Sequence, residues 1–258
     1  MYTNPVIDAH VHVSENGEWF GQDRDASYEK LMSQMENSGV DKGLILSLAQ
    51  LKQNDFVKSI CEKSKGKLFA LAGFDPLKQS VDEIGGYLDA DCFKGIKLHP
   101  RRENFSPLDE RAFPIYEAAM SKNLPVNFDV FGHTTTLPMD DIRPSVFDRL
   151  AKKFPKLKMV LSHCGAPWVM EAFFVAKSNK NVYLDCSFII SRFGDSSVFT
   201  DLLYTAKHLD QKLIYGSDFP EEPVNRYLSL AKIAFKELPE EKKSNIFGLN
   251  AARVYDLK

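Results

Sequence analysis

The chain has 258 residues, of which 44% are hydrophobic and 26% are charged, an ordinary composition for a globular protein. Its net charge of −2 argues against a general affinity for nucleic acid. No apolar run approaches the roughly 20 residues of a membrane-spanning helix, and the N-terminus lacks the basic and then apolar layout of a secretion signal. The four cysteines form no Cys-x-x-Cys pair, so we expect a cytoplasmic protein with reduced thiols.

Eight short apolar runs along the chain predict β-strands. Their spacing leaves room for one helix and two short loops between neighbours. The predicted strands are residues 6–12, 43–48, 68–73, 93–98, 125–130, 158–162, 182–187 and 213–215.

The segments between these runs have the apolar spacing of helices. In the first segment Ser27 is the expected N-cap, Leu31 and Met35 share one face, and Gly39 ends the helix. Further helices are predicted at residues 54–64, 80–88, 109–122, 145–153, 168–178, 197–207 and 224–236, followed by a helical cap at 240–247 and 251–255.

Strict alternation of strand and helix predicts a parallel sheet covered by helices. Eight units favour an α/β fold of the (β/α)8 TIM-barrel type, although an open eight-stranded sheet also fits the pattern. No change in composition divides the chain, so we expect one domain over residues 1–258. The longest irregular stretches, 14–26, 100–107 and 131–144, each follow a strand, on the face where barrel enzymes hold their active sites.

Polar residues accumulate at the carboxyl ends of the predicted strands, although strand interiors in a parallel barrel are apolar. Five of the six histidines lie in or just past these ends, and His208 is the exception. Buried polar groups at this density are costly unless they pair or bind a metal. The residues concerned are Asp8, His10, His12, Lys97, His99, Asn127, Asp129, His133, Ser162, His163, Asp185, Ser187, Ser217 and Asp218.

The residue types point to a catalytic metal site. His10 and His12 lie two residues apart on one strand face, so both imidazoles can reach one ion, and Asp218 offers an oxygen ligand across the barrel. His163 is placed to hold or deprotonate a metal-activated water, or to polarise the substrate.

A cationic group follows the fourth predicted strand. Lys97, His99 and Arg101 offer positive charge or hydrogen-bond donors to an anionic substrate, and Arg102 extends that side of the mouth. Structural alternatives remain open for each of these residues. In those alternatives Lys97 forms an ion pair that is purely structural, His99 is a hydrogen-bonded turn residue, and the two arginines are a solvated surface pair.

Several motifs together resemble the amidohydrolase superfamily, in the amidohydrolase-related branch that includes aminocarboxymuconate-semialdehyde decarboxylase, aromatic-acid decarboxylases and pyrone-dicarboxylate lactonases. The resemblance covers essentially the whole chain. The motifs are IDAHVH at 7–12, GIKLHP at 95–100, LSHCG at 161–165, VYLD at 182–185, YGSDFP at 215–220 and FGLNAAR at 247–253.

The resemblance implies a distorted (β/α)8 barrel with one divalent metal, usually zinc. It implies that His10, His12 and Asp218 are metal ligands and that His163 is the catalytic histidine. If this chain is a hydrolytic member, it also implies that Asp218 moves a proton.

One position departs from the family pattern. Many relatives have a metal-binding histidine at the end of the fifth strand, where this chain has Asp129. Three interpretations remain open: Asp129 is a ligand, which would also suit manganese; His133 reaches back to the metal; or the site has lost its metal. We retain Asp129 as a predicted ligand.

The leading functional hypothesis is a metal-dependent hydrolase of a small, anionic substrate. Alternatives are a metal-dependent, non-oxidative decarboxylase of an aromatic or unsaturated acid, and a barrel that binds a ligand without catalysis. We expect no nucleic-acid or membrane partner, and a homodimer is a further hypothesis. Aromatic residues in the predicted loops either wall the substrate or pack the loops on the rim: Trp19, Phe20, Phe105, Phe131, Phe188 and Phe193.

Overall fold

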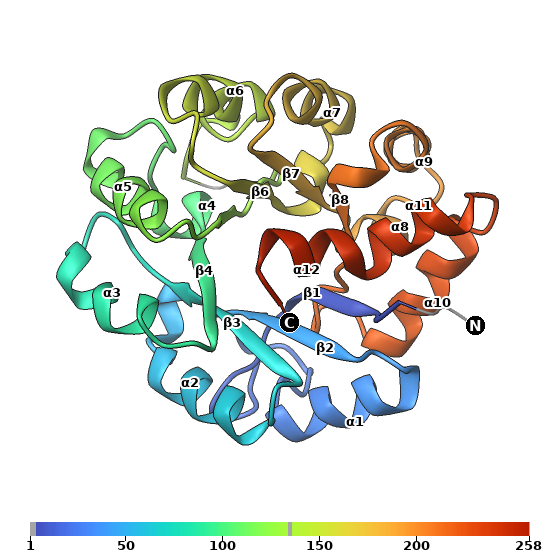
Figure 1. Ribbon diagram of the computed structural model, residues 1–258, viewed down its shortest axis with the longest axis horizontal. Helices are drawn as coiled ribbons and strands as arrows, with labels where there is room; N and C mark the ends of the chain where they lie inside the picture. Colours follow the sequence, from blue (N-terminus) through green and yellow to red (C-terminus); the bar gives the residue numbers. More distant parts are fainter. Residues whose placement is uncertain (1–3, 134–135, 258) are drawn as a thin grey trace.

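At the centre of the computed structural model, which describes residues 4–133 and 136–257, lies an eight-stranded sheet in sequence order, with every neighbouring pair parallel (Figure 1). The strands are β1 (Ile7–Val11), β2 (Lys42–Leu46), β3 (Leu68–Gly73), β4 (Phe93–Leu98), β5 (Val126–Phe128), β6 (Met159–Leu161), β7 (Val182–Asp185) and β8 (Leu213–Ile214). Each overlaps one of the eight predicted runs, so the predicted strand number and order are confirmed.

The sheet closes where β8 meets β1. The backbone N–H of Ala9 donates to the carbonyl of Tyr215 over 3.0 Å, and Val11 forms a parallel bridge with Phe219. This contact distinguishes a nearly closed barrel from the open sheet that the sequence pattern also allowed. The predicted TIM-barrel fold is therefore confirmed.

Helices surround the barrel, as the alternating pattern predicted (Figure 1). Ser27 caps the first helix by accepting from the backbone N–H of Lys30, and Gly39 ends it with a left-handed φ of 76°. The helices of this outer layer are α1 (Tyr28–Ser38), α2 (Asn54–Lys63), α3 (Val81–Leu88), α5 (Phe113–Ser121), α6 (Pro144–Lys153), α7 (Val169–Ser178), α9 (Ser197–His208) and α10 (Val224–Ala234).

Two short helices lie in segments for which the sequence predicted no helix. They are α4 (Pro100–Glu103), directly after β4, and α8 (Ile189–Arg192), after β7. Pro100 favours the first turn of α4, and the Glu103 carboxylate accepts from the backbone N–H of His99 over 2.7 Å. A single turn of this kind lacks the apolar period that identifies longer helices.

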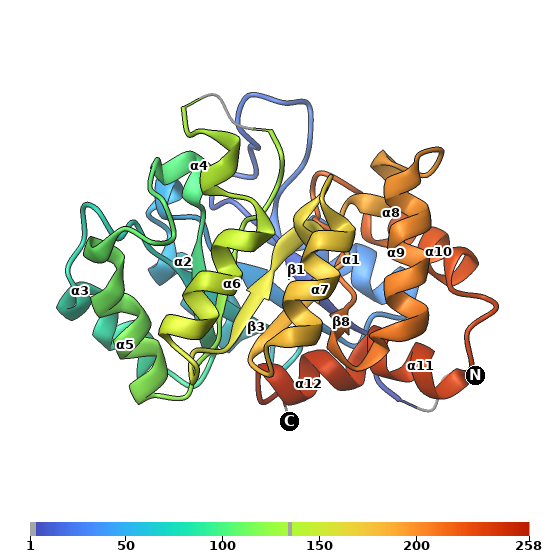
Figure 2. The same ribbon diagram turned by 90° about the horizontal axis from the view of Figure 1, so that it is seen from above.

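The two ends of the barrel differ. At one end α11 (Glu240–Ser244) and α12 (Asn250–Val254) cover the strands (Figure 2). Val254 and Tyr255 there belong to the same hydrophobic cluster as Ile7 and Leu44. α4 and the long loops after the strands lie at the opposite end (Figure 2). Within the described ranges, no helix is long and apolar enough to cross a bilayer.

Candidate functional site

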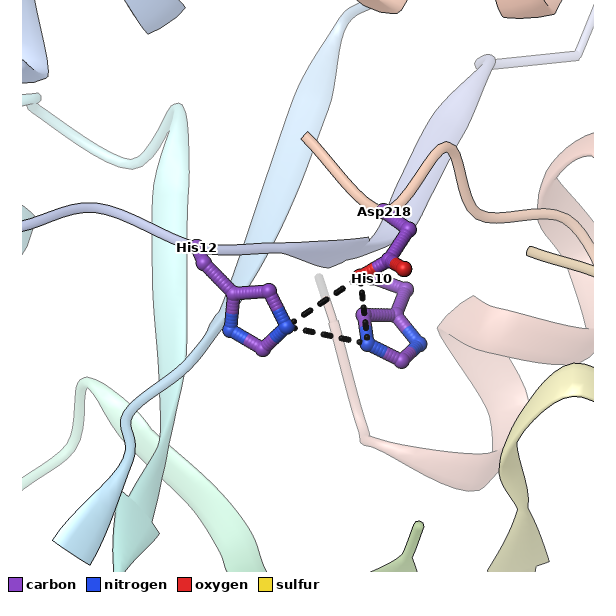
Figure 3. A group of neighbouring side chains, drawn as sticks. All are labelled: His10, His12 and Asp218. Carbon is purple, nitrogen blue, oxygen red and sulfur yellow. Dashed lines mark hydrogen bonds and ion pairs between the residues drawn. The ribbon is translucent and has the colours of Figure 1, made fainter. Parts of the chain in front are cut away.

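Three predicted metal ligands converge at the open end of the barrel. His10 and His12 project from the end of β1, and Asp218 lies in the segment after β8 (Figure 3). The two Nε2 atoms are 3.2 Å apart, and Asp218 Oδ1 lies 3.3 Å from His10 Nε2 and 3.2 Å from His12 Nε2. All three residues are buried. The structure thus brings together side chains that are about 200 residues apart in the sequence.

A hydrogen bond on the opposite ring nitrogen orients each histidine. His10 Nδ1 lies 2.9 Å from Asp185 Oδ2, and His12 Nδ1 lies 2.7 Å from the carbonyl oxygen of Leu46. Because these oxygens only accept, each Nδ1 carries the proton and each Nε2 presents its lone pair to the other ligands. Burial lowers the pKa of His10 to about 4 and that of His12 to about 3, so both rings are neutral at neutral pH.

The donor set fits a divalent metal ion. Two nitrogen lone pairs and a carboxylate oxygen face one another without a proton between them, an arrangement that a cation would stabilise. Two histidines and one carboxylate are also the ligand types of open, catalytic zinc sites. Asp218 has a left-handed backbone, with a φ of 71°, and burial raises the pKa of its carboxyl against the opposing effect of His10 and His163.

His163 lies beside this group, after β6. Its backbone φ of 56° is in the left-handed region, and its side chain lines the same cavity as the three predicted ligands. Its Nδ1 lies 3.0 Å from Ser187 Oγ, and its Nε2 lies 3.4 Å from Asp129 Oδ1. Burial opposes protonation of the ring, but the carboxylates of Asp129 and Asp218 outweigh it and raise the pKa of His163.

Asp129, at the position where relatives are expected to have a histidine, is paired with the cationic side chain of Arg101. Its carboxylate forms a two-bond ion pair with Arg101, through Nε at 2.5 Å and Nη2 at 2.9 Å. His99 Nε2 lies 3.5 Å from the same carboxylate. Burial disfavours its charged form, yet Arg101 and His99 hold the pKa of Asp129 well below its usual range. Arg101 also donates to the carbonyl of His133 over 2.6 Å.

A cavity of about 250 Å³ opens over these residues. Lys97 lies in its wall, nearly fully buried, and its Nζ donates to Asn127 Oδ1 over 2.7 Å and to Ser162 Oγ over 3.3 Å. Both partners are neutral, and among the described residues Lys97 forms no ion pair. Burial accordingly lowers the pKa of Lys97, although Asp129 and Asp185 partly oppose that shift.

Comparison with known proteins agrees with this geometry. The sequence matches the model of the amidohydrolase family over residues 7–257. The chain belongs to the amidohydrolase family. It is therefore an enzyme of the metal-dependent amidohydrolase superfamily, and the alternative of a non-catalytic barrel is not supported. A search of curated proteins finds no match.

Solved structures with the same fold share little sequence with this amidohydrolase. An uncharacterized TIM-barrel protein from Bordetella bronchiseptica has a TM-score of 0.80 and 18% identity, over 98% of this chain and 99% of the other. A probable 2-pyrone-4,6-dicarboxylic acid hydrolase from Acinetobacter baumannii, with citric acid bound, has a TM-score of 0.74 and 16% identity, over 97% of this chain and 99% of the other. A 5-carboxyvanillate decarboxylase from Novosphingobium aromaticivorans, complexed with manganese and 4-hydroxy-3-methoxy-5-nitrobenzoic acid, has a TM-score of 0.76 and 12% identity. The match covers 99% of this chain and 97% of the other.

The structure brings every predicted site residue of the amidohydrolase to the cavity. His10, His12, Lys97, His99, Arg101, Asp129, His163 and Asp218 all line it, together with the predicted loop aromatics Trp19, Phe131 and Phe188. Of the remaining aromatics, Phe105 is buried in the hydrophobic core and Phe193 packs against it, while Phe20 is 40% exposed.

The supporting role of the segment at the end of β7 was not predicted from the sequence. Asp185 binds His10, and the Ser187 hydroxyl lies 3.0 Å from both His10 Nδ1 and His163 Nδ1. The signal was present, because Asp185 and Ser187 alternate on one face like the two histidines of β1. Their partners, however, come from other strands and could not be assigned from spacing alone.

Proposed function

We propose that this enzyme is a metal-dependent hydrolase of a small anionic substrate. The observation that carries the proposal is the convergence of two neutral Nε2 atoms and the Asp218 carboxylate at the base of a cavity. Zinc is the first candidate because of the nitrogen-rich ligand set, and manganese is the second. A metal held there would supply Lewis acidity, which makes water a nucleophile near neutral pH.

Asp218 and His163 are the proposed proton-transfer groups. Asp218 has a buried carboxylate with a raised pKa, which favours uptake of a proton from an attacking water. His163 has a raised pKa as well, so near neutral pH its Nε2 is suited to donate to a substrate oxygen on which negative charge develops.

The charge of the cavity supports an anionic substrate. Arg101 and Asp129 neutralise each other, and within the part of the chain that the structure describes the buried ammonium of Lys97 has no carboxylate as an ion-pair partner. We propose that Lys97 binds a carboxylate or comparable anion of the substrate, with His99 and Arg101 completing that wall. The role of Asp129 as a further metal ligand remains a proposal. To bind a metal, its carboxylate would have to release Arg101, with which it forms an ion pair.

Removal of the metal tests the proposal. The protein is stripped with a chelator and assayed against a panel of lactones, amides and esters of small carboxylic acids, before and after addition of Zn²⁺ or Mn²⁺. We expect stripped protein and the His10→Ala variant to lose activity by at least about 100-fold. His208→Ala, in a histidine that lies outside the cavity, is the control. Full activity without metal would refute the proposal.

Decarboxylation is the second candidate. The buried Lys97 ammonium would bind a substrate carboxylate equally well if the reaction leaves that carboxylate intact or releases it as carbon dioxide. Release of carbon dioxide from aromatic or unsaturated acids, measured beside the hydrolase assay, separates the two reactions. We also propose a cytoplasmic location and a homodimer. Size-exclusion chromatography with light scattering would check the homodimer.

A further inference from the structure

The loop between β1 and α1 covers the site on the side of His12. The indole of Trp19 stacks on the His12 ring, with 5.3 Å between the ring centroids and an angle of 26° between the planes. Trp19 is only 2% exposed, and both rings line the cavity. One face of a proposed metal ligand is therefore covered by a loop residue.

The Glu221 carboxylate fastens this loop to the segment after β8. Trp19 Nε1 donates to Glu221 Oε1 over 2.8 Å, and Gln22 Nε2 donates to the same oxygen over 3.3 Å. Arg24 forms an ion pair with Glu221 Oε2 at 3.3 Å and donates to the carbonyl of Pro220 over 2.9 Å. Three side chains of one loop thus depend on a residue that follows Asp218 by three positions.

His12 has little other support. Its Nδ1 donates to one backbone carbonyl, that of Leu46, whereas His10 Nδ1 faces both Asp185 and Ser187. A single hydrogen bond allows an imidazole to rock about the bond axis, and a stacked indole opposes that movement. The stack in turn requires the loop to stay in place.

We propose that Glu221 is a positioning residue: through Trp19 it holds the His12 ring and keeps the β1–α1 loop closed over the metal position, so that it slows the exit of the metal. The inference rests on the proposed metal site. Its action is kinetic, because Glu221 makes no contact with the ligand atoms themselves and its removal leaves His10, His12 and Asp218 in the chain.

The rate of metal release tests the inference. Protein loaded with Zn²⁺ is mixed with an excess of a chromogenic chelator, and transfer of the ion is followed. We expect Glu221→Ala to release Zn²⁺ at least about tenfold faster than the unaltered protein. Trp19→Phe keeps a stacking ring but loses the N–H donor, so a smaller acceleration of a few fold is expected. Glu222→Gln is the matched control, because Glu222 pairs with Arg226 at 2.8 Å instead of with the loop.

A second readout follows the loop itself. Trp19 and Trp168 are the two tryptophans of the chain, so a Trp168→Phe background isolates the fluorescence of Trp19. Glu221→Ala should make Trp19 more accessible to acrylamide quenching, and Glu222→Gln should not. If Glu221→Ala fails to fold by circular dichroism, Trp19→Phe carries the release test.

The outcomes separate this inference from the proposed function. Release at the unaltered rate from both Glu221→Ala and Trp19→Phe, in protein that binds Zn²⁺ normally, would overturn the inference and leave the proposed function standing. An unaltered protein that binds neither Zn²⁺ nor Mn²⁺ would refute the proposed function and the inference with it. Unchanged acrylamide quenching in Glu221→Ala would independently refute the role of Glu221 in holding the loop.

Discussion

His10 and His12 are chemically equivalent ligands on one strand, but they are supported by different parts of the molecule. His10 is bound by Asp185 at the end of β7, inside the barrel, whereas His12 is bound by the carbonyl of Leu46 and covered by Trp19 from a loop. Residues held by the barrel contribute to the equilibrium affinity of a site, and a loop residue is better placed to control access to it. We therefore expect changes on the two sides to affect different quantities.

Asp129, in the segment after β5, is the proposed further metal ligand beside the two histidines and Asp218. Asp129→Asn should destabilise the fold by about 3 kcal/mol, the low end for a broken buried pair, because the Arg101 side chain remains 18% exposed. Urea unfolding of metal-free protein measures this loss. Isothermal titration with Zn²⁺ then tests the predicted ligand role of Asp129. A lower Zn²⁺ affinity in Asp129→Asn would establish Asp129 as a ligand, and an unchanged affinity would show that it is not one.

The side of His10 is tested by Asp185→Asn. Asparagine keeps the shape of the side chain, but its amide has one acceptor oxygen in place of two and cannot serve both His10 and Ser187. We expect Zn²⁺ affinity to fall about 10–100-fold, the usual effect of losing a carboxylate behind a histidine ligand. Competition with a chelator of known affinity measures it.

The exposed Asp195→Asn is the control for Asp185→Asn. If the two variants bind Zn²⁺ equally well, Asp185 does not orient His10, and the contrast between the two histidines is wrong.

The sequence predicted one half of this comparison better than the other. His10 and His12 were found because alternation along a strand is a local rule, and the apolar runs located the strand. The support of His12 was not predictable in the same way, since Trp19 and Glu221 are 202 positions apart and meet only through the path of two loops. Nor could spacing show that Arg101 pairs with Asp129, because that contact depends on the short turn of α4 that follows β4.

Ser187 connects the His10 side with the proposed catalytic histidine. Its hydroxyl donates to Asp185 Oδ1 and lies 3.0 Å from His163 Nδ1, yet that nitrogen also lies 3.2 Å from the Ser187 carbonyl. Because the carbonyl remains in Ser187→Ala, we expect the loss of about one hydrogen bond, or up to about a tenfold decrease in kcat. Zn²⁺ affinity should change less than in Asp185→Asn.

Ser191→Ala is the matched control for Ser187→Ala, since the Ser191 hydroxyl donates to the Phe188 carbonyl, over 3.1 Å, and not to a histidine among the described residues. If Ser187→Ala lowers metal affinity more than kcat, Ser187 supports the metal ligand His10 and does not position His163.

Mild acidification should have the smallest of these effects on Zn²⁺ affinity. A proton competes with the metal for Nε2, and burial lowers the pKa of His10 to about 4 and that of His12 to about 3. Both rings therefore stay neutral as the pH falls through 6.5, where an ordinary histidine becomes charged. We expect Zn²⁺ affinity to change by less than about threefold between pH 7 and pH 6, and to fall as the pH approaches the pKa of His10, whose neighbour Asp185 favours the charged ring. Titrations at a series of pH values measure this. A steep loss that begins near pH 6.5 would show that the rings are protonated as in water and that burial does not keep them ready for the metal.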